Sequence, residues 1–161
     1  LELCKKIIPS GSFYKLDITS EKLEEKFDLI VSADVIEHLN NDQAAIRNIS
    51  EMLNPGGRLI ISTLLGEMRA VERQVGHLRN YNKKDLLDKI TNTGLEIEQV
   101  TTWGWPIFSP IYRNLLNLIN NKGTMGKFGI FRKVICNILY YLFYLNSSKK
   151  GDYIFIRAKK I

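Results

Sequence analysis

The sequence has few of the residues that build disulfide frameworks and zinc sites. It holds two cysteines and two histidines, and the cysteines, Cys4 and Cys136, stand far apart. No group of Cys and His has the spacing of a structural zinc site, so we predict no metal. Each cysteine has apolar neighbours, which predicts buried free thiols in a reducing compartment and a cytoplasmic protein.

Long apolar runs and an N-terminal signal-peptide pattern are also missing. The apolar run at 134–145 is too short to cross a bilayer, which takes about 20 residues. Hydrophobic residues make up 45% and charged residues 25% of the chain, which excludes wholesale disorder. The chain begins at Leu1 without a methionine, in what reads as the middle of an amphipathic helix. We therefore expect it to be the C-terminal part of a longer protein.

Acidic residues are nearly absent from the last third of the chain. Residues 103–161 hold one, Asp152, beside ten Lys and Arg, whereas residues 1–102 hold 16 acidic and 13 basic residues. The same last third holds 12 of the 16 aromatic residues. Its basic residues stand beside an apolar helix rather than in a Lys and Arg stripe, which disfavours nucleic acid as a partner.

Strands alternate with helices along most of the chain, which predicts one α/β domain over 1–161 with a largely parallel sheet. The helices are expected at 1–8, at 42–53 with Asn41 or Asp42 as N-cap, and after the N-cap Asn82 up to Gly94. The expected strands are 13–16, 27–32, 58–63, 95–100 and 152–158, and the β-branched, apolar run at 27–32 predicts a strand that is buried on both faces. Residues 103–150 break the alternation and are predicted to be a mostly helical insertion before the last strand.

Polar side chains follow several of these strands. Ligands of open parallel sheets bind beyond the carboxyl ends of the strands, so these ends are the expected site. They are Asp17-Ile18, the segment S-A-D-V-I-E-H at 32–38, and residues 63–67. Asp17 taken alone suits a turn equally well.

Four stretches carry a family resemblance. F-D-L-I-V-S-A-D-V-I-E-H-L, then L-N-P-G-G-R-L-I-I-S-T after a helix, and then G-H-L-R-N-Y and T-G-L-E-I-E-Q-V, resemble the class I S-adenosylmethionine-dependent methyltransferases. The resemblance covers residues 1–102 and the last strand. It implies a three-layer Rossmann-like sheet, S-adenosyl-L-methionine as cofactor and a methyl acceptor as substrate.

The resemblance also implies roles for single residues. The Asp17 carboxylate would face the adenine amino group, and Ile18 would pack beside the ring. Ala33, Asp34 and Val35 would line the methionine part of the cofactor, and Glu37 and His38 would open toward the substrate.

One family feature has no counterpart. The family binds its cofactor through a glycine-rich loop after its first strand, and no G-x-G-x-G occurs here. We therefore expect the sheet to be incomplete at the N-terminus. This leaves an alternative, a cofactor-free remnant that binds a partner or a membrane. A nicotinamide-dependent oxidoreductase fits less well, because the last strand reads as antiparallel and N-P-G-G precedes a strand.

Methyl transfer needs an aligned acceptor, and a general base helps where the acceptor is a hydroxyl. His38 and His77 are the candidates, although either could instead hydrogen-bond a loop. Glu37 and His38 could also hold a divalent ion, as in some relatives with this pair, but they offer few ligands. His77, Arg79 and Tyr81 share one face if extended, where Arg79 could grip a carboxylate or phosphate; a solvated loop is the alternative.

The insertion begins at Trp103 with an aromatic, proline-containing stretch, and we expect Trp103 to contact the substrate. On a helix over 134–145, Lys133, Asn137, Tyr140 and Tyr144 would share one face, opposite an aliphatic face. This pattern predicts a lid over an apolar pocket, or peripheral membrane contact through 127–150. A helix buried in a homodimer is the alternative. We expect a small-molecule or lipid-linked acceptor.

Overall fold

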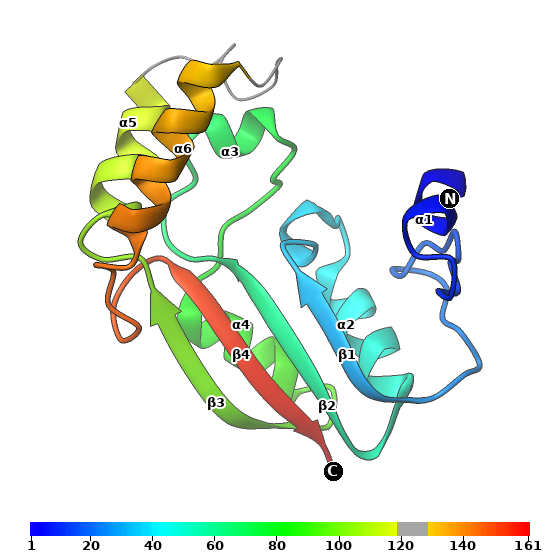
Figure 1. The fold of residues 1–161 in the computed structure, drawn as a ribbon. Helices are drawn as coiled ribbons and strands as arrows, with labels where there is room; N and C mark the ends of the chain where they lie inside the picture. Colours follow the sequence, from blue (N-terminus) through cyan, green and yellow to red (C-terminus); the bar gives the residue numbers. More distant parts are fainter. Residues whose placement is uncertain (119–128) are drawn as a thin grey trace.

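The computed structural model describes residues 1–118 and 129–161, and these residues form one four-stranded sheet of order β1-β2-β4-β3 (Figure 1). The first two strands are parallel, and β4 is antiparallel to both of its neighbours. The predicted α/β class and the antiparallel last strand are therefore confirmed. The strands are β1 (Phe27–Ala33), β2 (Leu53–Leu64), β3 (Leu95–Trp103) and β4 (Tyr153–Lys160).

The helices follow the expected alternation up to β3 and then form the insertion. Asn41 and Asn82 are the N-caps of α2 and α4, as predicted, and their side chains accept hydrogen bonds from the N–H groups of Ala44 and Lys84. The helices are α1 (Glu2–Ile7), η1 (Ile36–His38), α2 (Asp42–Glu51), α3 (Ala70–Gln74), α4 (Lys83–Thr91), η2 (Phe108–Tyr112), α5 (Arg113–Leu118) and α6 (Ile130–Phe143).

Both α2 and α4 lie behind the sheet in Figure 1 and bury its apolar face. No helix of the described ranges covers the front face, so two of the three expected layers are seen. Leu29 and Val31 of β1 are 53% and 59% exposed, and the prediction that this strand is buried on both faces is wrong. The reason is that, among the described elements, β1 has a helix, α2, behind one face only (Figure 1) and pairs with β2 alone.

The predicted strand at 13–16 is not formed. These residues have no regular structure, and none of the described strands pairs with them. A short apolar run becomes a strand only where a neighbour accepts its backbone hydrogen bonds. The sequence of residues 13–16 does not show whether a neighbouring strand is available to pair with them.

The prediction of buried thiols is also wrong, since Cys4 and Cys136 are both free and exposed. Helix α1 buries none of its residues, so the apolar neighbours of Cys4 are exposed with it. Cys136 lies on α6, where Leu139 and Phe143 are half-buried and the other described side chains are exposed. Apolar neighbours along a helix do not bury a residue unless another element packs on that face.

Helices η2, α5 and α6 lie together beyond the carboxyl end of β2 (Figure 1), and they confirm that a helical segment interrupts the last two strands. Residues 127 and 128 of the predicted membrane-facing segment lie outside the described residues. None of the helices in the described ranges is long and apolar enough to cross a bilayer.

Candidate functional site at the carboxyl ends of β1 and β2

The backbone at the end of β1 turns sharply at Asp34. This residue has φ +50, a left-handed conformation that is rare outside glycine and that gathers at functional sites. Its carboxylate accepts a hydrogen bond of 2.6 Å from the Tyr153 hydroxyl at the start of β4. Burial and then this carboxylate raise the pKa of Tyr153 well above its usual range, so the hydroxyl stays a donor. Ala33, Asp34 and Val35 are exposed around it.

Glu37, which the resemblance places toward the substrate, is fully buried in η1, at 0% exposure. Its Oε2 accepts a hydrogen bond of 2.9 Å from the Thr63 hydroxyl of β2. Its Oε1 is buried without a hydrogen-bond partner. The bond from Thr63 joins η1, which follows β1, to the last residues of β2.

The two histidines come together although they are far apart in the sequence. The rings of His38 and His77 lie 4.7 Å apart between centroids, edge to face. The Nδ1 of exposed His38 lies 2.9 Å from the Gly76 carbonyl oxygen. Because a carbonyl only accepts, this nitrogen carries the proton and Nε2 has a free lone pair. The Nδ1 of His77 is buried without a partner.

Arg79 and Tyr81, which we expected to bind substrate, are committed to holding the loop between η1 and α2. Arg79 donates to the Leu39 and Asn40 carbonyl oxygens at 2.5 and 3.1 Å. Tyr81 is 4% exposed, and its hydroxyl donates to Asp42 at 2.9 Å. In this structure the two residues therefore make the contacts of a loop, which was the alternative to substrate binding, because the segment from 77 to 81 packs against η1.

Asp17 forms a local turn. Its carboxylate accepts hydrogen bonds from the backbone and hydroxyl of Thr19, and these bonds hold its pKa below the usual value. Ile18 is half-buried against the core, and its carbonyl oxygen accepts a hydrogen bond from Asn48. The two residues lie at a bend before β1, and the Asp17 carboxylate is still exposed.

Trp103, at the end of β3, joins an aromatic cluster rather than standing alone. Its ring lies 5.0 Å from Phe108, 5.8 Å from Phe143 and 6.4 Å from Tyr153 between centroids. The cluster connects α6 to the residue that binds Asp34. Beside it, Trp103 and residues of α6 line an open cavity of about 470 Å³.

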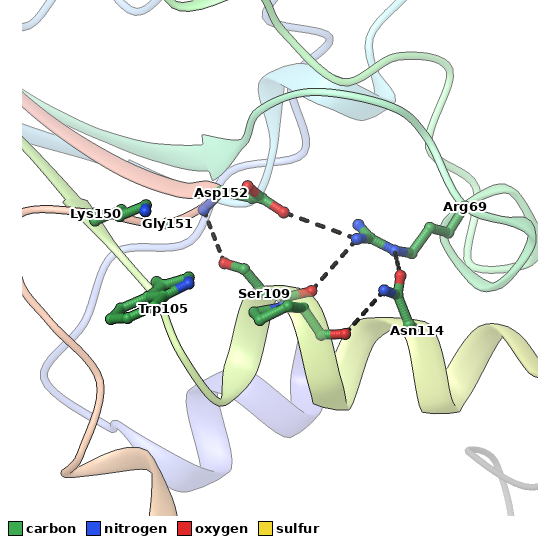
Figure 2. Close-up of a pocket in the computed structure, with 8 residues that line it drawn as sticks. Arg69, Trp105, Ser109, Asn114, Lys150, Gly151 and Asp152 are labelled. Atoms are coloured by element: carbon green, nitrogen blue, oxygen red, sulfur yellow. Dashed lines mark hydrogen bonds and ion pairs between the residues drawn. The ribbon is translucent and has the colours of Figure 1, made fainter.

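A second cavity, of about 370 Å³, lies where the insertion meets the segment after β2 (Figure 2). Arg69 crosses one side of it and donates to Asn114 Oδ1 at 2.9 Å and to the Ser109 carbonyl oxygen at 3.3 Å. On the other side, the Lys150 ammonium lies 4.7 Å from the centroid of the Trp105 ring. The arrangement offers two cations and the Asp152 carboxylate to a small polar group.

A model of the methyltransferase domain family matches residues 8–100. The chain belongs to this family. The family that the sequence motifs resemble is thereby confirmed, and the matched range includes Asp17, the end of β1 and both histidines.

Named relatives of the methyltransferase domain are similar over about half of this chain. YafE of Escherichia coli, an uncharacterized protein, is 28% identical over a match covering 52% of this chain and 45% of YafE. The ubiquinone biosynthesis O-methyltransferase of Rickettsia canadensis is 29% identical over 53% of this chain and 43% of its own length. The chain thus spans less than half of the length of these relatives.

The methyltransferase fold is also seen in a solved structure. The N-methyltransferase NodS of Bradyrhizobium japonicum, in complex with S-adenosyl-L-homocysteine, has a TM-score of 0.53 to this chain at 20% identity. The match covers 98% of this chain and 59% of NodS. At this identity the likeness shows the fold, and it confirms the Rossmann-like class.

Proposed function

We propose that the protein transfers a methyl group from S-adenosyl-L-methionine to a small-molecule or lipid-linked acceptor. The observation that carries the proposal is the family match over residues 8–100, which includes the strand ends that gather Asp34, Glu37 and the two histidines. A relative named as an O-methyltransferase and a fold neighbour named as an N-methyltransferase support it.

The residues at the end of β1 fit the cofactor's chemistry. The cofactor carries a positive sulfonium and an ammonium group, and the exposed turn at Ala33, Asp34 and Val35 offers a carboxylate that Tyr153 holds in place. The exposed carboxylate of Asp17 and the half-buried Ile18 offer an acceptor and an apolar surface for adenine. When bound, the cofactor supplies an electrophilic methyl group, and the protein has to hold the acceptor in line with it.

The acceptor side of the proposal is the cluster of Glu37, His38 and His77. An acceptor hydroxyl has to lose its proton during transfer, and this cluster brings one carboxylate and two imidazoles together after the end of β1. The cavity beside Trp103 and α6 has aromatic walls, which suits an apolar part of the acceptor.

We further propose that α6 lies on an anionic lipid surface and that the protein works in the cytoplasm at the membrane. Ile130, Val134, Ile138 and Tyr141 are 50–83% exposed and follow one stripe of the helix. The half-buried Leu139 and Phe143 face the protein from the opposite side of the helix, so the stripe points away from the part of the protein that the structure describes. Residues 103–161 carry ten basic residues against one acidic residue. An apolar stripe beside basic residues is the pattern of interfacial helices.

Calorimetry with S-adenosyl-L-homocysteine on the full-length protein tests the cofactor proposal. We expect saturable binding that Asp34→Asn weakens about tenfold, as the loss of one charge-assisted hydrogen bond of about 1.5 kcal/mol predicts. Asp85→Asn, on the exposed first turn of α4, is the matched control and should bind as the parent does. Absence of binding would contradict the enzyme proposal and favour a cofactor-free binding module.

A further inference from the structure

Arg69 and Lys150 line the cavity of about 370 Å³ that Figure 2 shows, one on each side. They come from different parts of the chain, since Arg69 follows β2 and Lys150 lies just before β4. We propose that this cavity binds the phosphate group of a phosphate monoester. Binding of the phosphate does not depend on the proposed methyl transfer.

The Arg69 guanidinium supplies the first argument. Its side chain is 18% exposed, and its hydrogen bonds to described residues go to two neutral oxygens, one of an amide and one of a backbone carbonyl. A guanidinium has five N–H donors, so donors remain for a ligand. The carboxylate oxygens of Glu72 and Asp152 lie 3.9 and 3.8 Å from it, but both already accept hydrogen bonds from Arg113. Burial and then the Arg113 charge lower the pKa of Arg69, and a bound anion would offset both effects.

Lys150 supplies the second argument. No carboxylate of the described ranges forms an ion pair with its ammonium, which lies 4.7 Å from the centroid of the Trp105 ring. The ring attracts the ammonium to the wall of the cavity, and an ammonium has three N–H donors to direct at a ligand. Asp152, the carboxylate among the lining residues, is already bound to Arg113. The lining thus carries more positive than negative charge.

The arrangement of the donors decides the kind of anion. Figure 2 shows Arg69 on one side of Ser109, and Lys150 with Trp105 on the other side. A planar carboxylate presents its two oxygens in one direction and suits a single arginine. A phosphate monoester presents three oxygens in different directions and carries up to two negative charges, so it can accept hydrogen bonds from both cations at once.

The space beside the donors sets the size of the ligand. Ligand pockets commonly enclose about 300–1,000 Å³, so this cavity lies at the small end of the range. A neighbouring cavity of about 410 Å³ shares Arg69, Asn114 and Asp152 with it and has the exposed Arg73 on its wall. A phosphate in the first cavity can thus carry an organic group that extends into the second. If the proposed function holds, the phosphate belongs to the methyl acceptor, and this assignment alone rests on that function.

Calorimetric titration of the full-length protein with inorganic phosphate tests the site without any activity assay. Sodium chloride at about 0.15 M screens unspecific attraction, and we expect saturable binding in its presence. Arg69→Gln should weaken binding at least tenfold through the loss of charge-assisted hydrogen bonds, and Lys150→Gln about fivefold. The matched control is Lys149→Gln, which removes the same charge from an exposed residue outside the cavity lining and should bind as the parent does.

Asn114→Asp is a second variant that keeps the shape of the side chain. Asn114 accepts a hydrogen bond from Arg69 at 2.9 Å, so the new carboxylate would pair with the guanidinium and compete with the phosphate. We expect binding at least tenfold weaker than in the parent. Thermal unfolding without phosphate shows which variants are folded, and Asn114→Asp serves if Arg69→Gln does not fold.

Two further probes, glycerol phosphate and the water-soluble dihexanoyl phosphatidic acid, distinguish a soluble ester from a lipid phosphate, and the probe that binds more tightly identifies the source. The proposal is overturned if the parent shows no saturable binding of any of the three probes below about 10 mM. It is equally overturned if folded Arg69→Gln and Asn114→Asp bind phosphate as tightly as Lys149→Gln does.

Discussion

Glu72 and Arg113 form a buried ion pair that fastens the insertion to the segment after β2. Both side chains are under 10% exposed, and the Arg113 guanidinium also donates to Asp152 at 2.6 Å. Burial alone would raise the pKa of Glu72, but hydrogen bonds from the Arg69 N–H, Arg113 and Asn80 outweigh it and hold the pKa below its usual value. Glu72 is therefore ionised at neutral pH, and Arg113 depends on it.

Replacing Glu72 with Gln should lower the free energy of unfolding by about 3 kcal/mol, because the buried Arg113 guanidinium loses its principal counter-charge. Chemical denaturation at pH 7 measures this loss. The matched control is Glu51→Gln, which breaks the half-exposed pair with Lys22 and should cost less than about 1 kcal/mol. Equal losses in the two variants would show that the buried pair contributes no more than a surface pair.

Single-residue roles were predictable only where they depend on sequence neighbours. The caps at Asn41 and Asn82 need only the next turn of helix, and both predictions are confirmed. Arg79 donates hydrogen bonds to carbonyl groups that are 39 and 40 residues away in the sequence, so its local sequence could not predict them. Tyr153 and its contact with Asp34 were missed because 119 positions separate the two residues. The one signal in the sequence was an aromatic residue at the start of the last strand.

At the scale of elements, Asp42 clamps α2 to α4. This residue is 5% exposed, and its carboxylate accepts hydrogen bonds from Lys89 at 2.8 Å and from Tyr81 at 2.9 Å. Burial alone would raise its pKa, but these two donors outweigh burial and hold the pKa below 3.8. A group whose pKa is depressed in the folded state stabilises that state at higher pH, and the contribution is lost as the pH falls through the folded pKa.

Asp42→Asn should therefore destabilise the protein most at pH 6–7, and less as the pH falls below about 4. Urea unfolding at several pH values measures the difference in free energy between parent and variant. The control is Asp85→Asn, which lies on the exposed first turn of α4 and should show little difference at any pH. A constant difference for Asp42→Asn down to pH 3 would contradict the proposed clamp.

The elements that sequence patterns predicted well are those whose evidence is local. The β-branched runs of β2 and β4, and the helical spacing of α2 and α4, all gave the right element. The prediction of a strand at 13–16 was wrong because a strand depends on a partner elsewhere in the chain. The prediction that β1 is buried on both faces was wrong for a similar reason, since an apolar run does not show which faces other elements cover.

At the scale of the whole molecule, the apolar surface of α6 lies near part of the basic charge of residues 103–161. Lys133 is on α6, and Lys149 and Lys150 follow it before β4. Lysines near an apolar stripe attract anionic lipid headgroups, each by about 1 kcal/mol near the surface, and salt screens this attraction. The two features together predict lipid binding that needs both the stripe and the charge.

Flotation with vesicles of phosphatidylglycerol and phosphatidylcholine tests this prediction on the full-length protein. We expect binding that falls when the anionic lipid is omitted or when salt is raised from 0.1 to about 0.5 M. Ile138→Glu should weaken binding at least tenfold, since burial of an isoleucine contributes about 1.5–3 kcal/mol. Asn137→Glu adds the same charge beside the stripe without removing an apolar side chain and should weaken binding less. Equal effects of the two variants would contradict insertion of the stripe, and a dimer that Ile138→Glu dissociates would make α6 a protein interface instead.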